Sequence, residues 1–177
     1  MWFLPALLAL LGCRKDAPYQ STATASTASC DACEGGCVDE VVPAASAEHT
    51  EEALDYADPP PSGGDHNPCW APWGVHTEEV PDENWVHNLE HGGVVFLYNC
   101  PEGCPEEVAT LTRLVESLEV WALLTPYSEL GVPFAAVSWE HRLLLQCVDE
   151  DVLDQWFLDH VNRGPESSYG DPSDSCM

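Results

Sequence analysis

The sequence has very little positive charge. Only five of its 177 residues are Lys or Arg, against 31 Asp or Glu, and the formal net charge at pH 7 is −26. A surface of this charge repels the phosphates of nucleic acids and anionic lipid headgroups, which excludes nucleic-acid binding. It attracts cations, although an acidic excess of this kind is usually just a solvated surface.

The sequence also lacks an apolar run long enough to cross a membrane, which takes roughly 20 residues in a helix. Its longest apolar run, residues 2–11, has instead the length of the apolar core of a signal peptide. The run closes on a lipobox order, in which a small residue, Gly12, precedes a cysteine that receives diacylglycerol, Cys13. We therefore expect residues 1–12 to be a signal peptide. Cys13 would then anchor an exported lipoprotein to the cell-envelope membrane, on its periplasmic or surface side.

One feature departs from the usual signal peptide. No Lys or Arg precedes the apolar run, and the basic pair Arg14 and Lys15 follows the cysteine instead. A misassigned start codon would explain this order. The alternative is a buried N-terminal helix with a structural cysteine.

Signatures of common enzymes are missing too. The sequence contains no nucleotide-binding loop, no Ser-His-Asp order and no internal repeat. Whether the protein is an enzyme stays open, although we favour a binding protein. The side chains that could bind a ligand or take part in a reaction are those of the cysteines and the histidines.

Cysteine is abundant, with nine residues in the chain. That number is unusual in a reducing cytosol and natural in an oxidising compartment, where disulfides persist. Without the lipidated cysteine eight remain, an even number that fits disulfides but allows about 105 pairings. Three of them, Cys30, Cys33 and Cys37, are closely spaced. They fit either a thiolate metal clip or, as we favour, one local disulfide plus one bond to a distant cysteine.

The chain is predicted to divide into a tether and one folded domain. Residues 13–55 are rich in Ser, Thr, Ala and acidic residues and show no hydrophobic period, so we expect them to be disordered. Residues 56–165 form the expected domain, whose modest core would be helped by disulfides. Residues 166–177 are expected to be a flexible C-terminal tail.

The domain is predicted to be a small α/β fold with a central, mostly buried sheet flanked by helices. Apolar and β-branched runs predict strands at 94–98, 120–124, 134–139 and 143–147. The spacing of apolar residues predicts helices at 105–118 and 149–162. A shorter helix at 83–91 would begin after Asp82 as its N-cap and end at Gly92. This order of elements resembles part of a thioredoxin-like fold.

Histidines and one glutamate form the first candidate site. His87 and His91 stand four residues apart on one face of the predicted short helix, a spacing that lets two imidazoles bind one zinc or copper ion. His66, in a Gly-rich loop, is a candidate third ligand, and Glu90 is a candidate partner that orients an imidazole. His76 lies in the same stretch. The alternative is that these histidines only bond loop backbone and hold the proline-rich segment in place.

The same residues match, literally, the inverted zinc-protease motif His-x-x-Glu-His, in which the glutamate is a general base. That motif lies in a long helix of a much larger enzyme and needs a distant carboxylate ligand. The helix predicted here ends at Gly92. We therefore do not interpret this motif as the site of a zinc protease.

The second candidate site is the pair Cys100 and Cys104, between a predicted strand and a predicted helix. A thiol at a helix N-terminus is stabilised as the thiolate, which suits redox exchange or Cu(I) binding. The stretch locally resembles the copper-delivery proteins of cytochrome oxidase assembly. The alternative that we favour is structural, with one of the two cysteines bonded to Cys147 as a staple between the first and last elements.

Two motifs extend the comparison to a family. Pro60-Pro61-Ser62-Gly63-x-x-His66 and Val86-His87-x-Leu89-Glu90-His91-Gly92 resemble a bacterial family, the domain-of-unknown-function family numbered 3105. The resemblance implies an exported or membrane-anchored protein, because its members are typically of those kinds, but it implies no activity. The family pattern includes the three histidines and the glutamate of the first site, whereas Cys100, Cys104 and Cys147 are not general family features. The resemblance thus favours the histidine cluster.

Three functions remain open. The first, which we adopt, is a lipoprotein that binds copper or zinc through His66, His87 and His91 with Glu90. The second is an enzyme, either a metal-activated hydrolase or a thiol oxidoreductase. The third is an envelope scaffold or interaction module with structural histidines. The sequence identifies no protein partner.

Overall fold

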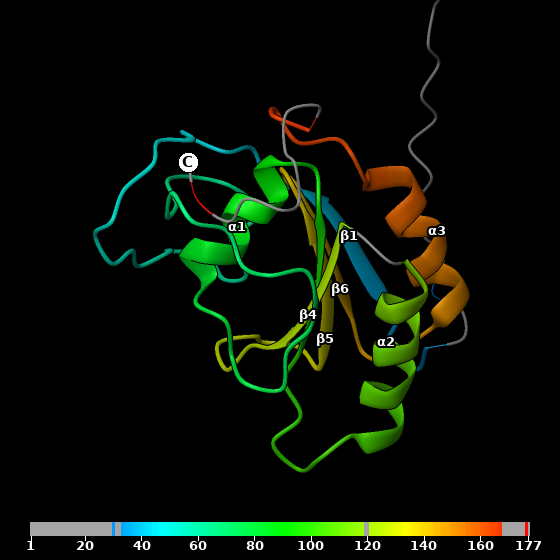
Figure 1. The fold of residues 1–177 in the computed structure, drawn as a ribbon. Coiled ribbons are helices and arrows are strands. Elements are labelled where there is room, and N and C mark those ends of the chain that lie inside the picture. Colours follow the sequence, from blue (N-terminus) through cyan, green and yellow to red (C-terminus); the bar gives the residue numbers. More distant parts are fainter. Residues whose placement is uncertain (1–29, 31–32, 119–120, 168–175, 177) are drawn as a thin grey trace, which may run out of the picture.

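The computed structural model describes residues 30, 33–118, 121–167 and 176. The predicted signal peptide, Cys13 and residues 14–29, 31 and 32 of the predicted tether lie outside the described residues. Within them the chain forms one domain with a mixed sheet and three helices, α1 (Asp82–Glu90), α2 (Pro105–Leu118) and α3 (Glu150–His160) (Figure 1). The predicted α/β fold class is confirmed.

The sheet contains six strands in the order β1-β6-β5-β3-β4-β2. Their bounds are β1 Cys37–Val41, β2 Gly74–Val75, β3 Val94–Tyr98, β4 Ala122–Pro126, β5 Phe134–Ser138 and β6 His141–Leu145. Strands β3 and β4 are parallel, and α2 connects them as a crossover helix. Strands β5, β6 and β1 add to β3 in antiparallel pairs. The unit β3-α2-β4-β5-β6-α3 is the predicted succession of elements that resembles a thioredoxin-like fold.

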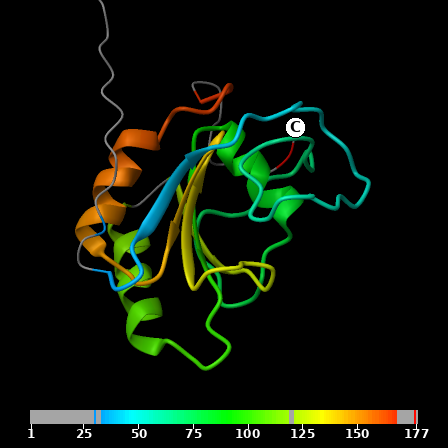
Figure 2. The same cartoon turned by 180° about the vertical axis from the view of Figure 1, so that it is seen from behind.

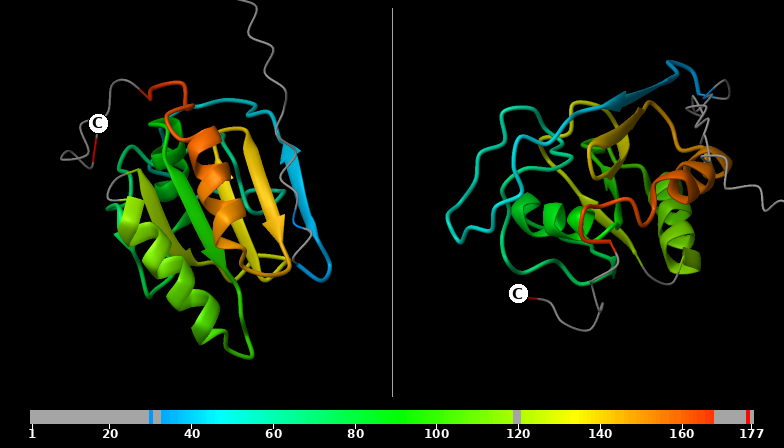
Figure 3. Two further views of the ribbon diagram at one scale, coloured as in Figure 1. Left: turned by 90° about the vertical axis from the view of Figure 1, so that its right-hand side faces the viewer. Right: turned by 90° about the horizontal axis from the view of Figure 1, so that it is seen from above.

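The sheet lies between two layers. Helices α2 and α3 cover one face, and α1 with the long loops before it covers the other (Figures 1 and 3). Because side chains alternate along a strand, β3 contributes to both cores. Phe96 belongs to the core with Leu114 and Trp156, and Leu97 belongs to the core with Trp85 and Leu89. Helix α1 is thereby fixed against the middle of the sheet.

The predicted elements are confirmed, with small shifts at their ends. Strand β4 begins two residues later than predicted, and β6 two residues earlier. The predicted N-cap of α1 was wrong, because Pro81 takes the N-cap position and Asp82 is already the first helical residue. Asp149 does cap α3, since its side chain accepts a hydrogen bond from the Val152 amide.

The predicted disordered tether was wrong over the residues that the structure describes. Strand β1 pairs with β6 along its whole length and forms one edge of the sheet. Two disulfides, Cys30–Cys37 and Cys33–Cys147, fasten this part of the chain. The folded domain therefore begins before Tyr56. Edge-strand residues such as Val38 and Val41 are exposed, so β1 has no hydrophobic period by which to recognise it.

The segment between β1 and α1 is a long loop that wraps around α1 and extends beyond the sheet on that side (Figure 2). Among the described residues it contains only one short strand, β2, which pairs with β4. Arg142 of β6 holds its start, donating hydrogen bonds to the carboxylates of Glu40 and Asp58 and to the carbonyl of Pro60. The loop is thus an ordered layer of the domain.

The disulfides correct two further predictions. Cys100 and Cys104 bond to each other, and Cys147 bonds to Cys33, so the predicted staple between the first pair and Cys147 was wrong. The predicted arrangement of Cys30, Cys33 and Cys37, one local disulfide plus one distant bond, is confirmed. The predicted flexible tail was wrong at its described end, because Cys176 bonds to Cys69.

Candidate metal centre

Helix α1 is buried although many of its buried residues are polar. All six residues from Trp85 to Glu90 are buried, and half of them are His, Asn or Glu. A buried polar side chain is costly unless it has a partner, and a buried ionisable one is rare without a specific role. The partners of these side chains therefore define the candidate site.

The loop that follows His66 lies alongside α1 and is bonded to it. The amide of Asn67 donates to the carbonyl of Glu83 at 2.8 Å. The Asn88 side chain exchanges two hydrogen bonds of 2.9 Å with the backbone of Ala71. These bonds place the imidazole of His66, which is fully buried, against the last turns of α1.

Four side chains converge there: His49, His66, His87 and Glu90. One ligand atom of each lies within 4.8 Å of the others. The ring centroids of the three imidazoles form a nearly equilateral triangle, with sides of 4.9, 4.8 and 4.8 Å. Such a group of side chains could hold one metal ion.

The backbone fixes which ring nitrogens face the centre. Nδ1 of His66 donates to the carbonyl of Gly64 at 2.7 Å, and Nδ1 of His87 donates to the carbonyl of Asn67 at 2.7 Å. A carbonyl oxygen only accepts, so both Nδ1 atoms carry hydrogen and the lone pair of each neutral ring is on Nε2. Metal-binding histidines are typically oriented in this way by a backbone carbonyl.

One contact at the centre requires a proton or a metal ion between two acceptors. Nε2 of His66 lies 2.9 Å from Oε2 of Glu90, and Nε2 of His49 lies 3.4 Å from the same oxygen. With Nδ1 of His66 already protonated, a neutral ring would face the carboxylate with two acceptors in contact. A proton between the two groups satisfies this contact, and a metal ion could take its place.

The electrostatics agree with a proton there in the metal-free protein. Burial, the largest single effect, would lower the pKa of His66, but its hydrogen bonds to Glu90 and to the Gly64 carbonyl, together with the charges of Glu90 and Asp65, raise the pKa overall. Burial would raise the pKa of Glu90, but the bond to His66 and its charge lower it. Burial lowers the pKa of His87 to about 4, and the neighbouring imidazoles add to this. His66 and Glu90 thus form an ion pair beside a neutral His87.

Sequence reasoning missed His49. Its backbone forms a parallel bridge with His66, in which the amide of Thr50 donates to the His66 carbonyl and the amide of His66 donates to the Glu48 carbonyl. The bridge carries the His49 ring over the buried side chains, and about a third of that side chain remains exposed. No local signal marks His49, because it lies in the acidic stretch that was predicted to be a tether.

The other predicted site residues lie nearby or elsewhere. His91 is not in the four-residue group, but its Nε2 lies 2.9 Å from Nε2 of His87, and the two rings are stacked. His76 lies outside the site and bonds the carbonyl of Pro72. His66 and Glu90 both lie in the four-residue group, and their roles as metal ligand and as orienting partner stay predictions.

Aromatic rings enclose the buried side of the site. Trp70 packs against the rings of His87 and His91, and Trp139 packs edge-on against His66. No thiolate is available among the described residues, since all eight of their cysteines form disulfides. The ligand set is therefore imidazole and carboxylate, which suits zinc and copper(II).

The family assignment follows from the same residues. The family model described as protein of unknown function (DUF3105) matches residues 48–173, which include all four converging side chains. The chain belongs to the DUF3105 family. No curated protein and no solved structure matches it. This DUF3105 protein contains four disulfides in its described part, which indicates an oxidising environment outside the cytoplasm. None of the helices in that part is long and apolar enough to span a membrane.

Proposed function

We propose that this DUF3105 protein binds a transition-metal ion, zinc or copper, through His49, His66 and His87 together with Glu90. The observation that carries the proposal is the 2.9 Å contact between Nε2 of His66 and the Glu90 carboxylate, in a ring whose other nitrogen already donates to a carbonyl. A metal ion satisfies both acceptors at once. It would also bind Nε2 of the neutral His87 ring, whose lone pair accepts a hydrogen bond from Nε2 of His91 in the metal-free protein.

The burial of the ligands favours tight binding by a preorganised site. His66 and His87 are fully buried and are held by backbone carbonyls, so they need little reordering when an ion arrives. His49 is the partly exposed ligand and offers the way in from solvent. Binding must displace the second proton of His66, so affinity is expected to fall as the pH is lowered.

We further propose that the protein is an exported lipoprotein anchored by Cys13. The support is the lipobox order at residues 10–13 and the set of disulfides in the domain. Intact-mass spectrometry of the membrane-extracted protein should show a chain that starts at an acylated Cys13. A mass that includes residues 1–12 without lipid would contradict the anchor.

The metal proposal is tested by metal content. Protein purified without an affinity tag or chelator should contain close to one equivalent of zinc or copper, or bind it on exposure to both metals. Replacing His66→Ala together with His87→Ala should abolish binding. His49→Ala, which removes a partly exposed ring and should leave the fold intact, should weaken affinity by about tenfold to a hundredfold. Elemental mass spectrometry and a competitive zinc titration measure both effects.

Matched variants separate the possible outcomes. His76→Ala with His160→Ala removes two histidines outside the group and should keep the metal. Cys100→Ser with Cys104→Ser should keep it too, because these cysteines are bonded to each other. Metal lost only in the cysteine variant would instead favour a site at that pair. Absence of metal from well-folded wild type after exposure to zinc and copper would exclude the proposal. It would favour the envelope-scaffold function instead.

A metal-activated hydrolase remains the alternative that uses the same site. It would need an open coordination position for water beside the ion. The partial exposure of His49 is the observation that favours such access. Loss of hydrolytic activity together with metal, in the variants described above, would distinguish an enzyme from a metal-binding protein.

A further inference from the structure

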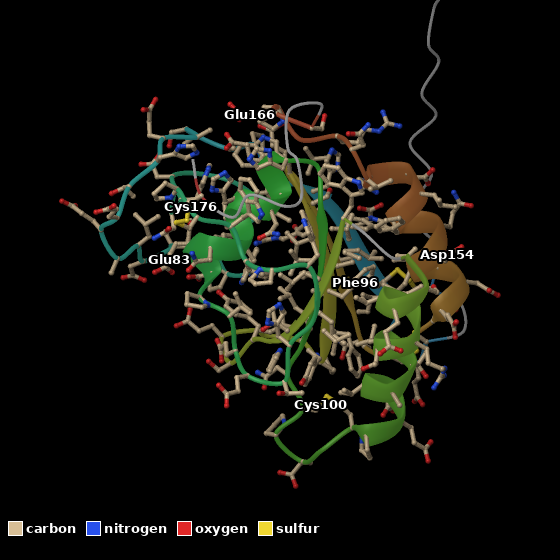
Figure 4. All side chains as sticks on the ribbon, viewed as in Figure 1. Glu83, Phe96, Cys100, Asp154, Glu166 and Cys176 are labelled. Atoms are coloured by element: carbon tan, nitrogen blue, oxygen red, sulfur yellow. A yellow bond between two sulfur atoms is a disulfide. The ribbon has the colours of Figure 1, made fainter. Side chains whose placement is uncertain are left out.

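A second group of ligands lies where the chain after α3 meets the end of α1. This segment crosses from the α3 side of the sheet to the α1 side (Figure 3). The amide of Asn162 donates to the Gly92 carbonyl at 2.7 Å, and the amide of Glu166 donates to the Glu90 carbonyl at 3.0 Å. Glu166 lies at the opposite end of the molecule from Cys100 (Figure 4). One ligand atom each of Glu90, His91 and Glu166 lies within 4.8 Å of the other two.

Two glycines make this close approach possible. A Cβ atom on Gly164 would overlap the carbonyl oxygens of Leu89 and Glu90. Gly92 has a φ of +86°, which favours glycine, and a Cβ atom there would lie 2.7 Å from Cα of Asn162. Any larger residue at either position would push the segment, and the Glu166 carboxylate with it, away from α1.

His91 is the observation that points to a ligand here. Its side chain is almost fully buried, with 2 % of the residue exposed. His87 carries its hydrogen on Nδ1, so in the metal-free protein the 2.9 Å contact between the two Nε2 atoms needs a hydrogen on His91 Nε2. This hydrogen bond is given up when Nε2 of His87 binds the first ion, whereas Nδ1 of His91 is not affected. The lone pair of the His91 ring is then on Nδ1, and this atom makes no hydrogen bond within the described part of the chain. A buried acceptor without a donor is rare in native proteins.

We propose that the site binds two divalent transition-metal ions that share Glu90, the first as described above and the second through His91 and Glu166. This inference rests on the proposed function and extends it from one ion to two. A carboxylate with two oxygens can bind both ions, and carboxylate-linked pairs are common in two-metal sites. The second ion would also offset the repulsion between two carboxylates that lie close together at the end of a helix.

The donor set indicates the kind of ion. One imidazole and two carboxylates suit zinc and similar divalent ions better than Cu(I), which prefers thiolate or thioether sulfur. Three protein ligands leave a position for water, as in zinc sites that keep an open coordination. Glu166 is only half-buried, so this position is reached from solvent separately from His49.

Zinc stoichiometry tests the second position. The full chain is dialysed against buffered free zinc, and its bound ions are counted by native mass spectrometry. Wild type is expected to hold two ions, whereas Glu166→Gln and His91→Gln should each hold one. Glu102→Gln, which removes an exposed acid in the turn between Cys100 and Cys104, should hold two. Loading with two equivalents of Cu(II) should give the half-field signal of a coupled pair in electron paramagnetic resonance, and Glu166→Gln should lose it.

The outcomes separate this inference from the proposed function. One ion in wild type that Glu166→Gln retains would overturn the second position and leave the first standing. Two ions in both proteins would overturn it as well, since the second ion would then bind elsewhere on the acidic surface. No ion in folded wild type would overturn both proposals.

Discussion

Loss of the Cys33–Cys147 disulfide is expected to lower the free energy of unfolding by about 5 kcal/mol. The bond joins residues 114 positions apart, and cross-linking such a long loop strongly reduces the entropy of the unfolded chain. Cys33 is buried in the core beneath α2 and α3, so alanine, which adds no polar group, is the suitable replacement. The variant Cys33→Ala with Cys147→Ala, compared with wild type by urea unfolding, measures the effect.

A second disulfide provides the matched control. Cys100–Cys104 closes a loop of only four residues, and its removal by two alanines should cost about 2 kcal/mol. Both variants lose two sulfur atoms, so the difference between them reports loop length. Equal losses in the two variants would contradict this account. Metal binding should survive in the control, because Cys100 lies at the opposite end of the molecule from Glu166 (Figure 4), whose amide bonds Glu90.

Acid should destabilise the metal-free protein between pH 6.5 and about pH 4, by up to about 3 kcal/mol. The unfolded chain binds a proton at His87 below pH 6.5, whereas burial delays protonation of the folded protein until about pH 4. Stability therefore falls as the pH drops through this window. His91, whose pKa burial also lowers, acts in the same direction.

His66 and Glu90 also contribute to the dependence of the unfolding free energy on pH, His66 above pH 6.5 and Glu90 below pH 4.5. The raised pKa of His66 stabilises the fold fully below pH 6.5, and this contribution is lost as the pH rises through its folded value. The lowered pKa of Glu90 gives a contribution that is present above pH 4.5 and lost as the pH falls through its folded value. Maximum stability is thus expected near pH 6.5.

The measurement compares the unfolding free energy of wild type and His87→Gln across this pH range, with a chelator in every sample. The curve of His87→Gln should be flatter by the predicted amount, whereas His76→Gln, outside the site, should follow wild type. Parallel curves for wild type and His87→Gln would contradict the assignment of a buried, neutral His87.

The sequence predicted the parts of this protein that have a local pattern. The apolar residues of α2, such as Leu111, Leu114 and Val115, recur at helical spacing and face the sheet as expected. His87 and His91 lie on one helical face for the same reason. Helices and buried strands are recognisable in a sequence because residues that face the core recur at a fixed, short spacing.

The remaining parts depend on contacts between distant residues. His49 joins the site through a backbone bridge to His66, and Glu166 through a bond to the end of α1. Both residues lie in segments whose composition predicted disorder. The exposed edge strand β1 shows no period, and disulfide pairing depends on the fold. The predicted domain, residues 56–165, therefore began too late and ended too early.

The cross-links near the start of the domain also determine how it responds to force. Force applied to the chain before Cys30 would be carried first by the Cys30–Cys37 disulfide. The Cys33–Cys147 disulfide would then transmit it to the chain after β6. Whatever tension remains would load β1 in shear against β6, because the two strands are antiparallel neighbours. The loop that carries His49 follows β1 in the chain, so it would carry no tension while β1 stays paired. Force applied at the N-terminal end of the described domain would therefore load these two bridges and the β1–β6 pair rather than the histidine cluster.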